Sequence, residues 1–185
     1  MRLCIVTLVI ASAAFAQNWT SLFDGKTLKG WTPEGGAEWK VRDGAIVVES
    51  GANGWLRSND SYGNFILSLE FNTAADGNSG VFLRSAKEGQ PHVTGYELQI
   101  FDNQPAGFHT GALVNHIKPQ KPSKIRPNEW MTYVIEARGP NWIVKLDGVT
   151  VLTGEDSKSL RGHIGLQYNT GKPIQFRNIK VQRLN

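Results

Sequence analysis

The alternation of apolar and polar side chains along short segments is the feature that most constrains how this chain folds. Over residues 64–71 every second side chain is apolar, in the order Phe65, Leu67, Leu69 and Phe71. Successive side chains of a β-strand point to opposite faces, so this pattern predicts a strand with one buried face. No long window has apolar residues at the i, i+3, i+4 and i+7 spacing of an amphipathic helix. The sequence therefore predicts an all-β fold.

Turn signals divide the rest of the chain into further short strands. A Gly-Pro-Asn turn joins predicted strands over residues 130–138 and 142–146, and an Asp-Gly turn leads into a third over 149–153. Two final strands, over 163–168 and 174–184, flank a turn-rich cluster. Without helical crossovers or internal repeats, this pattern favours a two-sheet antiparallel jelly-roll sandwich over a β-propeller.

Residues 1–16 have the pattern of a secretory signal peptide. Arg2 precedes an apolar stretch over residues 5–15, and Ala14-Phe15-Ala16 matches a small-residue cleavage site. The apolar stretch is shorter than the ~20 residues that span a bilayer, which argues against a transmembrane anchor. We therefore predict one domain over residues 17–185, periplasmic or secreted, with no transmembrane segment after cleavage.

Composition and charge exclude several classes of function. The formal charge of +4, or about +3 without Arg2, is spread over both signs and is too weak to predict a nucleic-acid partner. Cys4 is the only cysteine and lies in the predicted signal peptide, so the mature domain has no thiol for a disulfide, a nucleophile or a metal ligand. The chain has no Gly-x-Gly-x-x-Gly after a strand and no phosphate-binding loop, so no nucleotide cofactor is expected.

Two neighbouring strand-like segments, over residues 78–84 and 95–102, carry polar groups where a fully buried strand would be apolar. Alternation places Arg84 on the face opposite the apolar side chains of the first segment. It places Glu97 and Gln99 on the corresponding face of the second segment. A cation, a carboxylate and an amide beside aromatic rings would suit a sugar or another polyol.

Segments along the whole mature chain resemble, in order and spacing, the 3-keto-disaccharide hydrolase family. They are Ser-Leu-Phe-Asp-Gly-Lys-Thr-Leu-Lys-Gly-Trp at 21–31, Trp-Lys-Val-Arg-Asp-Gly at 39–44, Asn-Phe-Ile-Leu-Ser-Leu-Glu-Phe at 64–71, and the shorter matches at 78–84, 95–100, 110–113, 121–122, 128–130, 165–167 and 176–179. The resemblance implies a concanavalin A-like jelly roll, exported in bacteria. It also implies action on glycosides or disaccharides that are already oxidised to a ketone at sugar carbon 3.

A ketone at carbon 3 changes the chemistry of glycoside cleavage. It acidifies the hydrogen on carbon 2, so a base can form an enolate, the group on carbon 1 can be eliminated, and water can then add. This route needs a base, a group that stabilises the enolate, and a proton donor for the leaving oxygen. The ketone would have to be made by another enzyme, so an upstream sugar 3-dehydrogenase is the expected pathway partner.

Glu97 and Arg84 are the candidate catalytic residues. Glu97 is an acid in mid-strand among apolar neighbours, where burial can raise its pKa, and it could act as the base or as a metal ligand. Arg84 could hold a substrate oxygen or the developing oxyanion through charge-assisted hydrogen bonds. The alternative for both is an ion pair that serves only the fold.

Four further residues are candidate substrate-binding residues. Gln99 and Gln167 each offer a donor and an acceptor for sugar hydroxyls, or else hydrogen bonds within the sheet. Asp102 and Lys121 would complete the rim of the site, although Asp102 could instead cap a turn and Lys121 could simply be solvated.

The histidines give no metal-binding signal. His92, His109, His116 and His163 form no His-x-x-x-His motif or tight cluster, so the requirement for a divalent metal stays open. His109 and His116 flank one of the family segments. Many relatives carry Asp-His after Gly-Leu-Gln, where this chain has Tyr168-Asn169, so a family-wide histidine role does not transfer to this position.

Two other classes of function fit the same sequence. Jelly rolls also serve as non-catalytic carbohydrate-binding modules, because a fold alone does not determine a function. The chain could also be a structural partner domain in an envelope complex, if protein covers the face of Arg84 and Glu97.

Overall fold

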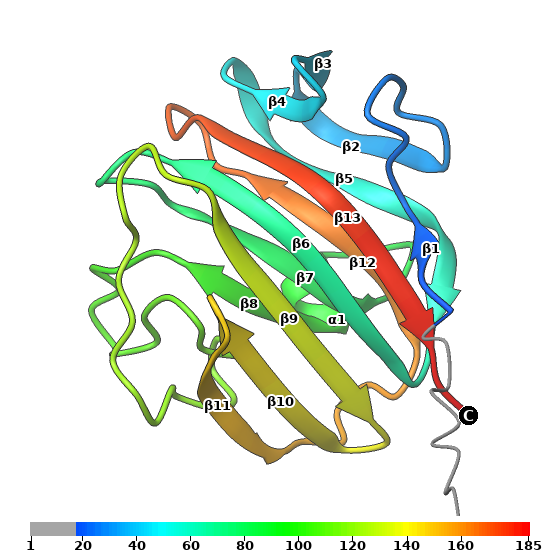
Figure 1. The fold of residues 1–185 in the computed structure, drawn as a ribbon, viewed down its shortest axis with the longest axis vertical. Coiled ribbons are helices and arrows are strands. Elements are labelled where there is room, and N and C mark those ends of the chain that lie inside the picture. Colours follow the sequence, from blue (N-terminus) through cyan, green and yellow to red (C-terminus); the bar gives the residue numbers. More distant parts are fainter. Residues whose placement is uncertain (1–17) are drawn as a thin grey trace, which may run out of the picture.

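The computed structural model describes residues 18–185, and the predicted signal peptide lies outside the described residues. Two antiparallel sheets pack face to face (Figure 1), which confirms the predicted all-β jelly-roll sandwich. One sheet runs in the order β11 (Val149–Glu155), β10 (Asn141–Leu146), β9 (Met131–Arg138), β6 (Phe65–Thr73), β13 (Ile174–Arg183), β4 (Ala45–Val48) and β3 (Lys40–Arg42), with β1 (Thr20–Ser21) on β13. The other runs β2 (Trp31–Ala37), β5 (Gly51–Tyr62), β12 (Gly162–Tyr168), β7 (Ser79–Ser85) and β8 (Tyr96–Ile100).

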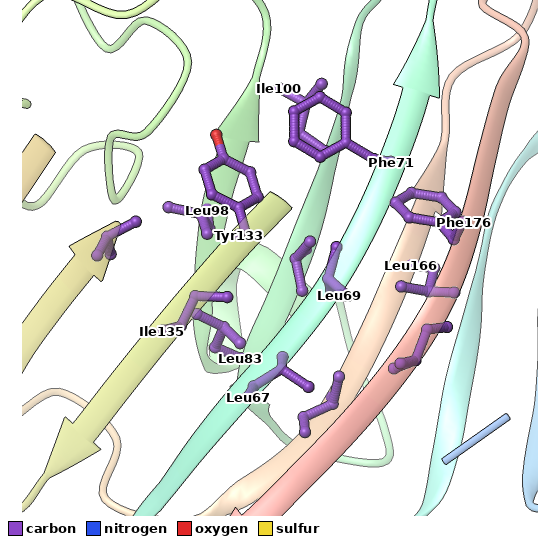
Figure 2. Close-up of a cluster of buried hydrophobic side chains, with 14 of the residues drawn as sticks. Leu67, Leu69, Phe71, Leu83, Leu98, Ile100, Tyr133, Ile135, Leu166 and Phe176 are labelled. Atoms are coloured by element: carbon purple, nitrogen blue, oxygen red, sulfur yellow. The ribbon is translucent and has the colours of Figure 1, made fainter. Parts of the chain in front are cut away.

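The core lies between the two sheets. Leu67, Leu69 and Phe71 of β6 are fully buried, as the alternating pattern predicted. They face Leu83 of β7 and Leu166 of β12 in the opposite sheet (Figure 2). Each fully buried aliphatic side chain contributes roughly 1.5–3 kcal/mol through removal of apolar surface from water.

The predicted hairpins are present in the eight-stranded sheet. Strands β9 and β10 pair around the tight turn with Arg138 opposite Asn141, and β10 pairs with β11. The last two predicted strands also form, but they lie in different sheets, since β12 joins the five-stranded sheet and β13 the eight-stranded one. The single short helix among residues 18–185 is α1 (Pro91–Thr94), which lies beside β7 and β8 (Figure 1). No helix in this range is long and apolar enough to cross a membrane.

A β-bulge in β7 overturns the predicted orientation of Arg84. Ser85 pairs with His163 and Phe82 pairs with Gly165, so Leu83 and Arg84 together stand opposite Ile164. Arg84 takes a left-handed conformation with φ of 53°. The extra residue breaks the two-residue alternation, and the Arg84 side chain turns into the space between the sheets. The prediction that Arg84 shares an outer face with Glu97 is therefore wrong.

Candidate functional site

Two rows of side chains cross the outer face of the five-stranded sheet, away from the core. Antiparallel register aligns one row through Glu34, Trp55, Gln167, Gly80 and Gln99. The register aligns the second row through Thr32, Arg57, Gly165, Phe82 and Glu97. The predicted residues Glu97, Gln99 and Gln167 therefore do share one face, and β5 adds Trp55 to it.

Two glycines within the strands let larger side chains lie across the sheet. A Cβ atom on Gly80 would stand 2.9 Å from Cγ of Glu97 and 3.0 Å from its Oε1. A Cβ atom on Gly165 would stand 2.2 Å from Cε3 of Trp55. Glu97 therefore crosses over Gly80 and the Trp55 ring covers Gly165, which explains why these strands carry glycine in their interiors.

A hollow of about 450 Å³ opens over this face. Its floor includes Trp55 and Phe82, whose rings meet edge to face with centroids 5.5 Å apart. Gln167 and Asn169 of the β12 end line it, and His92 of α1 lies at its rim. A volume of this size suits a small ligand, and aromatic rings with nearby amides suit the apolar and hydroxylated faces of a sugar.

Glu97 lies beside the hollow, opposite Phe82 across the ladder and hydrogen-bonded to the side chain of Gln167. Burial raises the pKa of Glu97 to about 7, although the hydrogen bond from Gln167 opposes the rise. No cation forms an ion pair with Glu97 among the described residues. A carboxyl with this pKa can both accept and release a proton near neutral pH, as a general acid or base must.

A chain of amides orients Gln167 toward Glu97. The Nδ2 group of Asn169 donates to the carbonyl oxygen and the Oδ1 atom of Asn78, both at 3.1 Å, and to Oε1 of Gln167 at 3.3 Å. With its oxygen held by Asn169, Gln167 has its amino group available for the Glu97 carboxylate. Asn169 therefore supplies an amide that positions the neighbour of Glu97.

An ion pair stands at the opposite end of the hollow. Nε and Nη2 of Arg57 contact Oε1 of Glu34 at 3.0 and 2.9 Å. Arg57 is 5% exposed, whereas Glu34 lines the hollow. Glu34 and Glu97 lie on the two edge strands, β2 and β8, so the polar face extends across the full width of this sheet.

Arg84 lies apart from this face and is fully buried. Its guanidinium donates to the carbonyl oxygens of Gly63 at 3.0 Å, Gly139 at 2.7 Å and Ser159 at 3.2 Å, and it lies 4.8 Å from the ring centre of Trp142. Burial lowers the pKa of Arg84. The position of Arg84 therefore supports neither the predicted contact with substrate nor the alternative ion pair with Glu97.

The remaining predicted residues divide between two places. Gln99 is 5% exposed on the face of Glu97, and its Oε1 atom is buried without a hydrogen-bond partner. Asp102 and Lys121 line a second hollow that shares no lining residue with the first. The Asp102 carboxylate accepts hydrogen bonds from the Thr110 hydroxyl at 2.6 Å and from the backbone N–H of Ile125 at 2.8 Å, so it ties loops together.

The histidines lie in different places relative to this hollow. His92 lines it, whereas His109 lines the second hollow. His116 contacts Asp156 at 2.8 Å, and Nδ1 of His163 lies 2.8 Å from the carbonyl oxygen of Ser58. Within residues 18–185, no three His, Cys, Asp or Glu side chains gather closely enough to hold a metal ion.

Trp55 and Glu34 also line the hollow and were not predicted as site residues from the sequence, whereas Phe82 lies on the polar face, as the alternation of its strand predicts. One available signal was glycine in strand interiors, at positions 80 and 165, because such glycines mark the close approach of other groups. The α1 residues carried no comparable signal.

Comparison with known proteins agrees with this architecture. The fold is a jelly-roll sandwich with a hollow on the outer face of one sheet. Residues 18–182 match the family described as the 3-keto-alpha-glucoside-1,2-lyase-like domain, and the chain belongs to this family.

A curated relative and several solved structures are similar to the chain. A 3-keto-disaccharide hydrolase of Bacteroides thetaiotaomicron is 27% identical over 111 residues, which cover 48% of this chain and 38% of that protein. The chain thus aligns with well under half of that relative. A candidate glycosyl hydrolase of Parabacteroides distasonis is 25% identical with a TM-score of 0.78, over 90% of this chain and 100% of that one. The carbohydrate-binding module CBM66 of Bacillus subtilis is 18% identical with a TM-score of 0.66, and the match covers 83% of this chain and 95% of that chain.

Proposed function

We propose that this protein cleaves 3-keto-glycosides or 3-keto-disaccharides, with Glu97 as the base that removes the proton from sugar carbon 2. The observation that carries the proposal is a carboxyl with its pKa raised to about 7, beside a hollow floored by aromatic rings. The family match and the relative from Bacteroides thetaiotaomicron support the choice of a substrate with a ketone at carbon 3.

The proposed reaction proceeds by elimination followed by hydration. The Glu97 carboxylate takes the hydrogen on carbon 2, and the electron pair of that C–H bond moves into the enolate of the carbon 3 ketone. The enolate re-forms the ketone and a carbon 1–carbon 2 double bond, while the bond from carbon 1 to the glycosidic oxygen breaks and that oxygen takes a proton. Water then adds its hydroxyl to carbon 1 and its proton to carbon 2, giving the free 3-keto sugar.

The surrounding residues have distinct proposed roles. Trp55 and Phe82 pack against the apolar face of the sugar ring. Gln167 orients the Glu97 carboxylate, and the amide of Asn169 holds Gln167 in place. His92 at the rim donates the proton to the leaving oxygen, because imidazole carries protons near neutral pH.

A direct test compares the purified protein on a 3-keto-disaccharide and on its unoxidised parent, with release of reducing sugar as the readout. We expect release from the ketone only, with and without added divalent metal. Glu97→Gln keeps the shape of the side chain but removes the base, so turnover should fall by at least about 100-fold, the lower range for loss of a general base. The matched control is Glu155→Gln, the same change at an exposed position.

The second candidate function is a non-catalytic carbohydrate-binding module, favoured by the similarity in fold to CBM66. It predicts that the 3-keto-disaccharide binds in a calorimeter without being cleaved. It also predicts that the Glu97→Gln variant binds the sugar as the unmodified protein does. Absence of ketone-dependent release at any metal concentration would reject the enzyme in favour of this module.

We further propose that the protein is exported by cleavage after residue 16 and receives its substrate from a sugar 3-dehydrogenase. The basic start, the apolar stretch and the small-residue site support export. Mass spectrometry of the protein from the periplasm or the culture medium should find Gln17 as the first residue.

A further inference from the structure

A second hollow of about 550 Å³ lies among the loops that connect β8 to β9. These loops are the long segment beyond the end of β8 in Figure 1. The hollow is lined by Lys118, Lys121, Lys124 and His109, together with loop residues that include Asp102. None of the residues that line the hollow beside Glu97 also lines this one, so ligand binding to the two hollows can be tested separately.

The three lysines of this hollow have no carboxylate partner. Every ion pair within residues 18–185 involves other cations, so no carboxylate oxygen lies within 4.0 Å of these ammonium groups. The ammonium group of Lys118 lies 5.2 Å from the ring centre of Phe108. Asp102 is the only acidic residue in the lining. Its Oδ1 accepts a hydrogen bond from the Thr110 hydroxyl, and its Oδ2 accepts one from the backbone N–H of Ile125. The positive charge of the lining therefore exceeds the negative charge.

The loop that carries the lysines is anchored at several points. The side chain of Gln120 makes two hydrogen bonds to the backbone of Thr153 in β11. Its Nε2 donates to the carbonyl oxygen at 3.0 Å, and its Oε1 accepts from the N–H at 2.8 Å. Pro119 and Pro122 restrict the backbone between the lysines. This anchoring holds the backbone from which the three exposed lysine side chains extend.

We propose that this hollow binds a sugar-sized ligand that carries an anionic ester group, either a phosphate ester with up to two negative charges or a sulfate ester with one. Three ammonium groups on one loop favour an anionic group, and lysine binds phosphate as a point charge. The volume lies within the range of small-molecule sites and leaves space for a sugar ring beside the anion. Binding here does not involve Glu97 and does not depend on the proposed cleavage reaction.

Calorimetric titration at low salt tests this proposal with glucose 6-phosphate, glucose 6-sulfate, inorganic phosphate, inorganic sulfate and glucose. We expect both sugar esters to bind at least tenfold more tightly than glucose and than the corresponding inorganic ion. The triple variant Lys118→Gln, Lys121→Gln, Lys124→Gln should lose at least tenfold in affinity for the esters. Preference for one ester over the other identifies which group the site takes.

The matched control replaces three exposed lysines elsewhere, as Lys26→Gln, Lys29→Gln and Lys145→Gln, and so removes the same net charge. This control should bind the esters as the unmodified protein does, and Glu97→Gln should as well. Equal losses in the two triple variants would show a general effect of charge and would overturn the proposal. Esters that bind no better than glucose, or no better than the inorganic ions, would overturn it too.

Discussion

At the scale of single residues, Glu97 couples the stability of the protein to pH. Burial raises its pKa from 4.5 to about 7 in the folded protein. Between these values the folded state holds a proton that the unfolded state has released, so the free energy of unfolding falls as pH rises from about 4.5 to 7. The Glu97→Gln variant lacks the carboxyl and so does not lose this free energy of unfolding as pH rises. In thermal unfolding, we expect the variant to be more stable than the unmodified protein at pH 8 and the two proteins to be about equally stable at pH 4.

The same carboxyl sets the expected pH dependence of cleavage. A base must be ionised, so kcat/KM should rise with pH on the acid side of the profile, with a midpoint of about 7, the pKa of Glu97. Initial rates on a 3-keto-disaccharide between pH 5 and pH 9 give the profile. If kcat/KM instead rises with a midpoint near pH 4.5, the ordinary pKa of a glutamate, the result would contradict the role assigned to the buried carboxyl.

At the scale of elements, the pairing of β7 with β8 places Glu97. Its side chain crosses Gly80, where a Cβ atom would stand 2.9 Å from Cγ of Glu97 and 3.1 Å from the carbonyl oxygen of Leu98. Gly80→Ala should therefore push the carboxylate away from Gln167. A shift of about 1 Å in a catalytic group can lower activity by up to about 100-fold, and we expect a loss of this order in kcat/KM.

A matched glycine separates this effect from a general loss of stability. At Gly63 the nearest atom to an added Cβ would be the carbonyl oxygen of Leu160, at 3.6 Å. Gly63→Ala should keep both activity and melting temperature. If Gly80→Ala also keeps full activity, Glu97 does not need its present position over β7.

At the scale of the whole molecule, Arg84 joins the two sheets. It extends from the bulge in β7 to the carbonyl oxygens of Gly63, Gly139 and Ser159, which lie in connections around the other sheet. Arg84→Met fills similar space but leaves three carbonyls of partly buried residues without this donor, and a buried acceptor left unpaired costs about 1–3 kcal/mol. We expect urea denaturation to show a loss of about 3 kcal/mol or more, with kcat unchanged for the folded protein.

Arg138→Met is the control for that substitution, because Arg138 is an exposed arginine beside Glu136. Exposed ion pairs contribute about 0–1 kcal/mol, so this variant should unfold close to the unmodified protein. If Arg84→Met instead lost much of its kcat at unchanged stability, the result would show that Arg84 has a catalytic role.

The directions of the side chains in β6 and β8 were predictable because every residue of these two strands follows the two-residue alternation. Glu97 and Gln99 therefore reach the outer face, and Leu67 and Leu69 reach the core, as the sequence indicates. The alternation failed at Arg84, where one extra residue in β7 stands opposite β12. A bulge depends on how two distant strands align, which the local pattern does not contain.

The sequence by itself determined the class of fold and the identity of the ionisable side chain on the polar face, since both follow from local alternation along each strand. Only the tertiary structure decided which side chains gather around Glu97. His92 and Trp55 join it because α1 and β5 pack near β7 and β12, and Lys121 is separated from it because its loop is anchored to β11. The physical reason is that strand alternation fixes the direction of a side chain, whereas its neighbours depend on the register between segments far apart in the chain.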